Sequence, residues 1–243
     1  MLNTDYVGDA VVVRRSSDNA TQSIGFVDGE LDTDTLNTFC SGANGFITTW
    51  HDQSGNGNNL TQSTAAAQPK IYDSINGIIE LNGKPAIYTD GVDDQLESGV
   101  LSLSNPNTQL IVLKTLSTSG HVGGLFNSAS NAPSLVATTT NYIMYQSGSQ
   151  VSPAFNHSNN QSLVTMKSST TGTDWELFGN GNEVLNSGED IGSFTGNQIS
   201  LSARNNNTLF TENYLQEYIL YNSDKTGDRV GIETNINNFY SIY

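Results

Sequence analysis

The chain has 243 residues, enough to bury a substantial core, and its 24 acidic and 9 basic residues give a formal net charge of −15. A nucleic-acid partner is not expected, because phosphate-binding surfaces need clustered Lys and Arg and the notable basic pair here is Arg14–Arg15. Charged residues make up only 14% of the chain, so its polarity comes from Asn, Ser, Thr, Gln and Gly. Such a surface suits an extracellular or virion protein with neutral, hydroxyl-rich partners. No apolar run approaches the ~20 residues of a membrane span, so membrane insertion is not expected.

Runs of alternating apolar and polar residues, bounded by Gly, Asn, Ser and Asp, predict short β-strands through most of the chain. In chain order these runs are Ala10–Ser16, Gly45–Asp52, Lys84–Asp90, Thr108–Leu116, Ser134–Gly148, Gln161–Ser169, Thr173–Gly181, Gln198–Arg204 and Asn213–Asn222. Short strands separated by turn residues are typical of two packed antiparallel sheets. The pattern therefore predicts an all-β sandwich or jelly roll.

Two segments have helical spacing instead of alternation. In 32–42, which starts with acidic residues and ends on a glycine, the apolar residues at this spacing are Leu36, Phe39 and Cys40. Near the C-terminus they are Ile232, Ile236 and Phe239 or Tyr240. No internal repeat or linker-like stretch divides the chain, so we expect one domain over residues 1–243.

The stretch VVVRRSSDNATQSIGF (Val11–Phe26), followed by FITTWHDQSGNGNNLTQ (Phe46–Gln62), resembles a module that occurs in two settings. One is the N-terminal catalytic domain of fungal α-L-arabinofuranosidase B. The other is a group of laminin-G-like modules in bacteriophage virion proteins and bacterial surface proteins, to which DGVDDQL (Asp90–Leu96) and the segment Glu217–Tyr243 are also similar. The resemblance implies a concanavalin A-like two-sheet antiparallel sandwich with one or two short helices.

The resemblance to the arabinofuranosidase implies a carboxylate nucleophile and a carboxylic acid/base, which retaining glycosidases hold about 5–5.5 Å apart. The position matching the nucleophile is Gly148, with Gln146 where the family has an Asp. The acid/base position falls on Arg204 or Asn205. Because neither position carries a carboxylate, we expect the scaffold without the chemistry, and no hydrolysis of aryl α-L-arabinofuranosides.

Other carboxylates could in principle form a catalytic pair. The candidates are Asp93–Asp94, Glu189–Asp190, and Glu212 with Glu217. In a chain with 24 acidic residues such pairs arise by chance, and exposed turn carboxylates are the preferred interpretation. No residue is therefore predicted to be catalytic.

The cluster Asp90, Asp93 and Asp94 could bind calcium, because closely spaced carboxylate oxygens suit a hard cation. The alternative is an Asx-type turn that leads into the next strand. The three histidines are far apart in sequence and lack zinc-site spacing, so no other cofactor is expected.

Neutral sugars are held by aromatic stacking and by amide and carboxylate hydrogen bonds. Residues of these types predict a glycan-binding surface formed by Tyr142, Tyr145, Trp175, Asn205, Asn206, Asn207 and Phe210. The competing interpretation is that Trp175, on an alternating strand, belongs to the core.

The stretch WHDQSGNGNNLTQ contains a histidine next to an aspartate, which raises the possibility of an acid–base pair. Adjacent strand residues point to opposite faces, so His51 is poorly placed to share a proton with Asp52. An Asp here is suited to bind backbone N–H groups two or three residues ahead. We therefore predict a structural turn made by Trp50, Asp52, Ser54, Gly55 and Gly57.

Taken together, these features favour a non-enzymatic structural or adhesive module of a bacteriophage virion, either a head-decorating fibre or a tail-associated receptor-binding part. Its expected partners are other virion proteins or further copies of itself, and a cell-surface glycan. Its expected location is the virion surface. The alternatives are a secreted glycoside hydrolase acting on α-L-arabinofuranosides and a carbohydrate-binding module at the bacterial surface.

Overall fold

The computed structural model of the chain describes residues 6–104, 106–116, 119–126, 131–146, 149–157, 159–168, 175–187, 195–196, 198–204 and 208–243. Within these ranges the chain is almost entirely β, with two α-helices, which confirms the predicted two-sheet antiparallel sandwich. No helix in the described ranges is long and apolar enough to cross a membrane.

The first layer of the sandwich is a continuous run of antiparallel strands. In spatial order these are β2 (Thr21–Ile24), β1 (Val11–Arg15), β5 (Gly45–Trp50), β6 (Leu60–Thr61), β12 (Leu96–Ser98), β23 (Gln198–Leu201), β15 (Ser119–Phe126), β16 (Asn131–Thr138), β17 (Asn141–Gln146) and β18 (Ser149–Asn156).

The second layer is also antiparallel. Its strands in spatial order are β8 (Gly77–Ile78), β7 (Lys70–Asp73), β11 (Ile87–Asp90), β24 (Glu212–Tyr221), β14 (Asn107–Thr115), β19 (Ser162–Ser168), β20 (Trp175–Gly179) and β21 (Asn182–Ser187). Because β7 pairs with both β5 and β11, the two layers are joined through this strand.

Short elements complete the fold. They are the pairs β3 (Phe26–Val27) with β4 (Glu30–Leu31), β9 (Glu80–Leu81) with β10 (Lys84–Pro85) and β13 (Leu103–Ser104) with β22 (Thr195–Gly196), and the 3₁₀ turn η1 (Ala65–Ala67).

The core lies between the layers. Leu96 and Leu201 are opposite each other in the first layer, and both belong to the same buried cluster as Ile111 and Leu215 of the second layer. Side chains alternate across each strand, so this packing leaves every second residue on an outer face.

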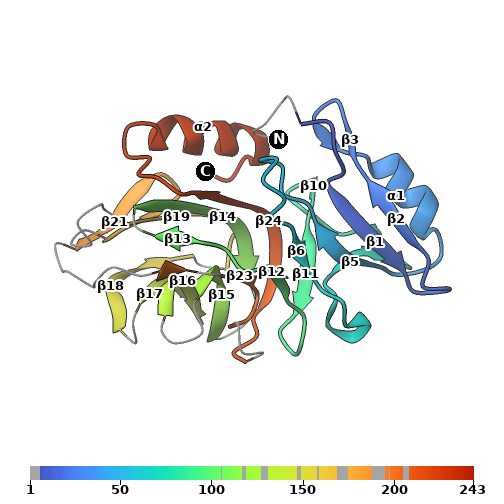
Figure 1. The fold of residues 1–243 in the computed structure, drawn as a ribbon, viewed down its shortest axis with the longest axis horizontal. Coiled ribbons are helices and arrows are strands. Elements are labelled where there is room, and N and C mark those ends of the chain that lie inside the picture. Colours follow the sequence, from blue (N-terminus) through green and yellow to red (C-terminus); the bar gives the residue numbers. More distant parts are fainter. Residues whose placement is uncertain are drawn as a thin grey trace.

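The helix α1 (Thr33–Cys40) packs beside β1 and β2 (Figure 1). Asp32 caps its N-terminus by accepting a hydrogen bond from the Thr35 N–H at 3.0 Å. The helix buries the predicted residues Leu36, Phe39 and Cys40.

The helix α2 (Arg229–Tyr240) lies across β14 and β19 of the second layer (Figure 1). Ile236 and Tyr240 pack there against Leu110, Val112 and Leu163. The helix begins at Arg229, three residues before the first apolar position of the predicted spacing, Ile232.

One predicted strand is in fact two. The run Ser134–Gly148 divides into β16 and β17, because Thr138 and Asn141 form the ends of a tight turn. The Asn141 N–H donates to Thr138 Oγ1 at 3.1 Å, which closes this hairpin.

Candidate functional site

The turn after β5 is organised around one carboxylate. Asp52 Oδ1 accepts a hydrogen bond from the Ser54 N–H at 2.8 Å, and Oδ2 accepts one from the Asn58 N–H at 2.9 Å. Gly55 and Gly57 have φ values of 85° and 76°, which a glycine adopts without steric cost. Burial raises the pKa of Asp52, but these hydrogen bonds outweigh burial and bring the pKa below its ordinary value.

The residues before Asp52 contact both the core and open space. Trp50 is half-buried and packs against the core cluster. The His51 N–H donates to the Ala10 carbonyl at 2.9 Å. Its ring Nε2 is buried and has no hydrogen-bond partner.

A cavity of about 720 Å³ lies beside this turn. This volume is within the range of small-molecule sites, roughly 300–1,000 Å³. The wall formed by the turn contains Trp50, His51, Asp52, Gln53, Ser54, Asn56 and Asn58. The hairpin β3–β4, the strands β10 and β24, and the end of α2 supply further lining residues.

Two carboxyl groups in this cavity interact with the same phenol. Burial raises the pKa of Glu217, which lines the cavity from β24. Burial, together with the nearby carboxylates of Glu217 and Glu30, raises the pKa of Tyr240 far above its ordinary value. Glu30 in turn forms an ion pair with Lys84, whose Nζ lies 2.6 Å from Glu30 Oε1. Among the carboxyl groups that line the cavity, burial therefore shifts Glu217 toward its protonated form, and Glu30 is paired with a cation.

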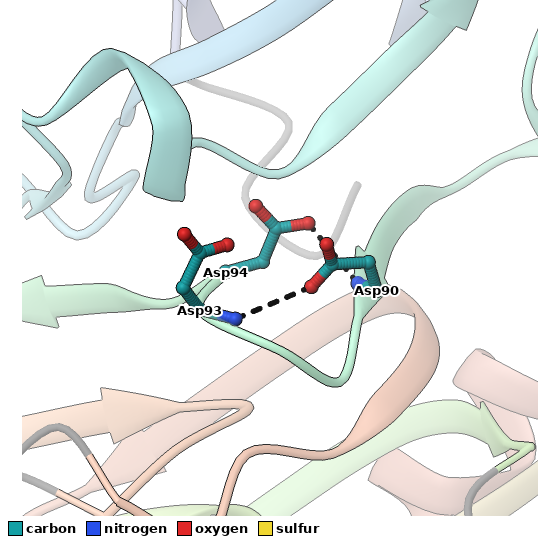
Figure 2. Close-up of side chains that lie close together, drawn as sticks. All are labelled: Asp90, Asp93 and Asp94. Atoms are coloured by element: carbon teal, nitrogen blue, oxygen red, sulfur yellow. Dashed lines mark hydrogen bonds between the residues drawn. The ribbon is translucent and has the colours of Figure 1, made fainter.

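Three aspartates gather where β11 turns toward β12 (Figure 2). One carboxylate oxygen from each of Asp90, Asp93 and Asp94 lies within 4.8 Å of the others. Asp94 Oδ2 accepts a hydrogen bond from the Asp90 N–H at 3.0 Å, and Asp90 Oδ1 accepts one from the Val92 N–H at 2.8 Å. Burial, and then the negative charge of Asp90, raise the pKa of Asp94 to about 7. The cluster is an Asx-type turn with the oxygen donors of the predicted calcium site.

Two of the predicted glycan-binding aromatics lie in the core. Tyr142 and Trp175 are both fully buried, and the Tyr142 hydroxyl donates to Thr115 Oγ1 at 3.1 Å. Phe210 is half-buried just before β24. The side chain of Tyr145 and residues 205–207 (Asn205, Asn206 and Asn207) lie outside the described part of the chain. Alternation placed Tyr142 and Trp175 on the inner side of their strands, so the core interpretation of Trp175 was the better one.

Other predicted positions are also accounted for. Gly148 and the pair Glu189–Asp190 lie outside the described ranges. Arg204 forms an isolated β-bridge with Thr208. Burial raises the pKa of the Cys40 thiol to about 11, so it is not an activated nucleophile.

Residues 1–86 match the family model described as "Alpha-L-arabinofuranosidase B, catalytic". The chain is 37% identical over 95 residues to α-L-arabinofuranosidase B of Emericella nidulans, a match that covers 35% of this chain and 19% of the fungal protein. The chain is similar to the catalytic domain of this enzyme.

Solved structures agree on the fold. A GH54 α-L-arabinofuranosidase soaked with a cyclic sulfate inhibitor superimposes with a TM-score of 0.76 at 16% identity, covering 96% of this chain and 60% of that one. An arabinofuranosidase complexed with arabinofuranosyl-α-1,2-xylobiose gives a TM-score of 0.70 at 16% identity with the same coverage. The chain thus spans 60% of the length of these two solved relatives.

These matches overturn the expectation of a non-enzymatic virion module on a virion surface. The matched family model is that of a catalytic domain, and the similar structures are glycoside hydrolases. The expectation rested on two positions, Gly148 and Arg204 or Asn205, chosen by their place in loosely matched strands. Carboxyl groups brought together from distant segments, such as Glu30 and Glu217, are invisible to that comparison. Of the sequence pairs, only Glu212 with Glu217 included one of them.

We predict that Asp52→Ala lowers the free energy of unfolding by about 1–3 kcal/mol, because the backbone amides of Ser54 and Asn58 lose their acceptor. Asp52→Asn, which retains one oxygen acceptor, is expected to lose less, and His51→Ala to change stability little. Urea unfolding of the three variants measures this. An unchanged midpoint for Asp52→Ala would contradict a structural role for the turn.

The raised pKa of Asp94 predicts a pH dependence of stability. Between the ordinary Asp pKa of about 4 and the folded-state value of about 7, the folded chain binds a proton that the unfolded chain releases. This contribution to stability is full at low pH and is lost as pH rises through about 7. Melting temperatures of Asp94→Asn should therefore exceed those of the wild type at pH 8 and approach them at pH 5. Equal differences at both pH values would refute the shift.

Calcium binding at Asp90, Asp93 and Asp94 stays a prediction. A cation binds the ionised carboxylates, so calcium at millimolar concentration is expected to raise the melting temperature at pH 8 and not at pH 5. Asp93→Asn should remove most of the increase, whereas magnesium should give less because it demands stricter geometry. The same increase in Asp93→Asn and in the wild type would place the ion elsewhere.

Proposed function

We propose that this chain is a glycoside hydrolase domain that acts on α-L-arabinofuranosides. One observation carries the proposal. The segment that matches the catalytic family model, residues 1–86, supplies the turn around Asp52 and the carboxyl group of Glu30, both of which line the cavity. The substrate class is taken from the similar fungal enzyme, and it agrees with an acidic chain that has few cations for binding charged ligands.

Glycoside hydrolysis uses two carboxyl groups with different protonation states. In this proposal Glu217 is the general acid, because burial favours the protonated form that can donate to the departing glycosidic oxygen. Glu30 is the carboxylate that faces the positive charge developing at the anomeric carbon. Lys84 fixes the position of the Glu30 carboxylate through their 2.6 Å ion pair.

The proposed location is extracellular. The chain is rich in Asn, Ser, Thr, Gln and Gly and poor in charged residues, a composition suited to contact with neutral glycans outside the cell. An extracellular location agrees with the alternative of a secreted hydrolase that the sequence left open.

Replacing the two carboxyl groups should affect different substrates differently. Glu217→Gln cannot donate a proton, so we expect about a 10²–10⁴-fold loss of kcat on methyl α-L-arabinofuranoside. The loss on 4-nitrophenyl α-L-arabinofuranoside should be much smaller, because 4-nitrophenolate departs without protonation. Glu30→Gln should reduce hydrolysis of both substrates alike.

Glu183→Gln is the matched control, since Glu183 is exposed on β21 and does not line the cavity. It should retain wild-type rates, and the melting temperatures of all variants should be compared. Wild-type protein that is folded yet fails to hydrolyse either substrate would refute the proposed function. Loss of activity in Asp94→Asn with none in Glu217→Gln would move the catalytic site to the aspartate cluster.

A further inference from the structure

Six large hydrophobic side chains share an unusual position at the cavity. All six are half-buried, pack on one side against the core cluster and line the cavity with the other: Leu31, Trp50, Leu101, Leu103, Tyr218 and Leu220. They come from separate segments, namely β4, β5, the chain between β12 and β14, and β24. The fold therefore brings together an apolar wall that no single stretch of sequence contains.

This wall is difficult to explain as ordinary packing. Protein interiors are close-packed, with few voids larger than a water molecule. A cavity of about 720 Å³ instead leaves these side chains facing open space. Apolar surface gains free energy when it leaves water, so the wall favours a ligand that covers it.

A sugar ring alone does not match such a wall. Sugar hydroxyls require hydrogen-bonding partners, and leucine side chains provide none. Such partners come from other lining residues, namely Ser54, Asn56 and Asn58 and the carboxyl groups of Glu30 and Glu217. His51 adds a ring Nε2 with no hydrogen-bond partner in the protein. The lining of the cavity thus offers both hydrogen-bonding groups and apolar side chains.

We propose that the cavity binds a furanoside whose aglycone is apolar, an alkyl chain or an aromatic ring, with the sugar hydroxyls bound by the polar lining groups and the aglycone against the leucines. The sugar half of this assignment rests on the proposed function. The apolar half rests on the six side chains and holds for any amphipathic ligand. It predicts that affinity depends on the size of the aglycone more than on further sugar units.

The apolar half can be tested without turnover. The neutral fluorescent probe N-phenyl-1-naphthylamine should bind the wild type with an increase in fluorescence. Leu101→Trp fills part of the cavity and should weaken probe binding at least tenfold. Val100→Trp is the matched control, because Val100 is the neighbouring residue, is 87% exposed and does not line the cavity. It should bind as the wild type does.

The furanoside part of the proposal is tested by displacement of the fluorescent probe from the Glu217→Gln variant. The competing ligands are alkyl α-L-arabinofuranosides, from methyl to octyl. Each added methylene should tighten binding about three- to fourfold, the change expected for burying one CH₂, until the cavity is full. Leu101→Trp in the same background should shorten the chain length at which tightening stops. Replacing the alkyl chain by a second arabinose should give no comparable gain.

The outcomes separate this proposal from the proposed function. Absence of probe binding to folded wild type, or equal binding to Leu101→Trp and Val100→Trp, would overturn the apolar site. Hydrolysis of arabinofuranosides with no dependence on alkyl length would overturn it while leaving the proposed function intact. Probe binding and chain-length dependence without hydrolysis by the wild type would support the apolar site and refute only the proposed function.

Discussion

The carboxylate of Asp52 binds the backbone N–H groups of Ser54 and Asn58, and this fixes where the chain leaves β5. The consequences extend well beyond the turn. Strand β5 pairs with β1, β6 and β7, and β7 in turn pairs with β11 of the second layer. The same turn forms one wall of the cavity. Asp52, which the sequence presents as a possible acid or base, thus fixes the position of one wall of the cavity.

The scarcity of basic residues makes the position of each one informative. With 9 Lys and Arg against 24 Asp and Glu, the chain has too few cations to pair one to one with most of its carboxylates. Lys167 is buried and forms an ion pair with Glu176, in which Lys167 Nζ lies 2.5 Å from Glu176 Oε2. Lys84, the first residue of β10, instead contacts both the carboxylate of Glu30 and the ring of Phe239. The Glu30 carboxylate in the cavity is therefore paired with one of the few cations of the chain.

Alternation and turn chemistry allowed much of the fold to be predicted, because they act over a few residues. The period of two identified most strands, and the helical spacing of Leu36 and Phe39 identified α1. The same local logic led to the prediction that Asp52 holds its turn. It could not reveal the cavity, since Glu30, Leu101 and Glu217 become neighbours of one space only through the pairing of distant strands. It also could not decide whether Tyr142 faces a ligand or the core, where tertiary packing places it.

A raised pKa does not by itself mark the catalytic carboxyl group of this chain. Burial raises the pKa of Asp94, Glu97 and Glu217 alike. Asp94 is held in its own turn by the Asp90 amide, and neither Asp94 nor Glu97 lines the cavity. A general acid must reach a glycosidic oxygen, so it needs space for a substrate as well as a proton at neutral pH. Among the described carboxyl groups with raised pKa values, Glu217 is the one that lines the cavity, and the cavity rather than the titration assigns its role.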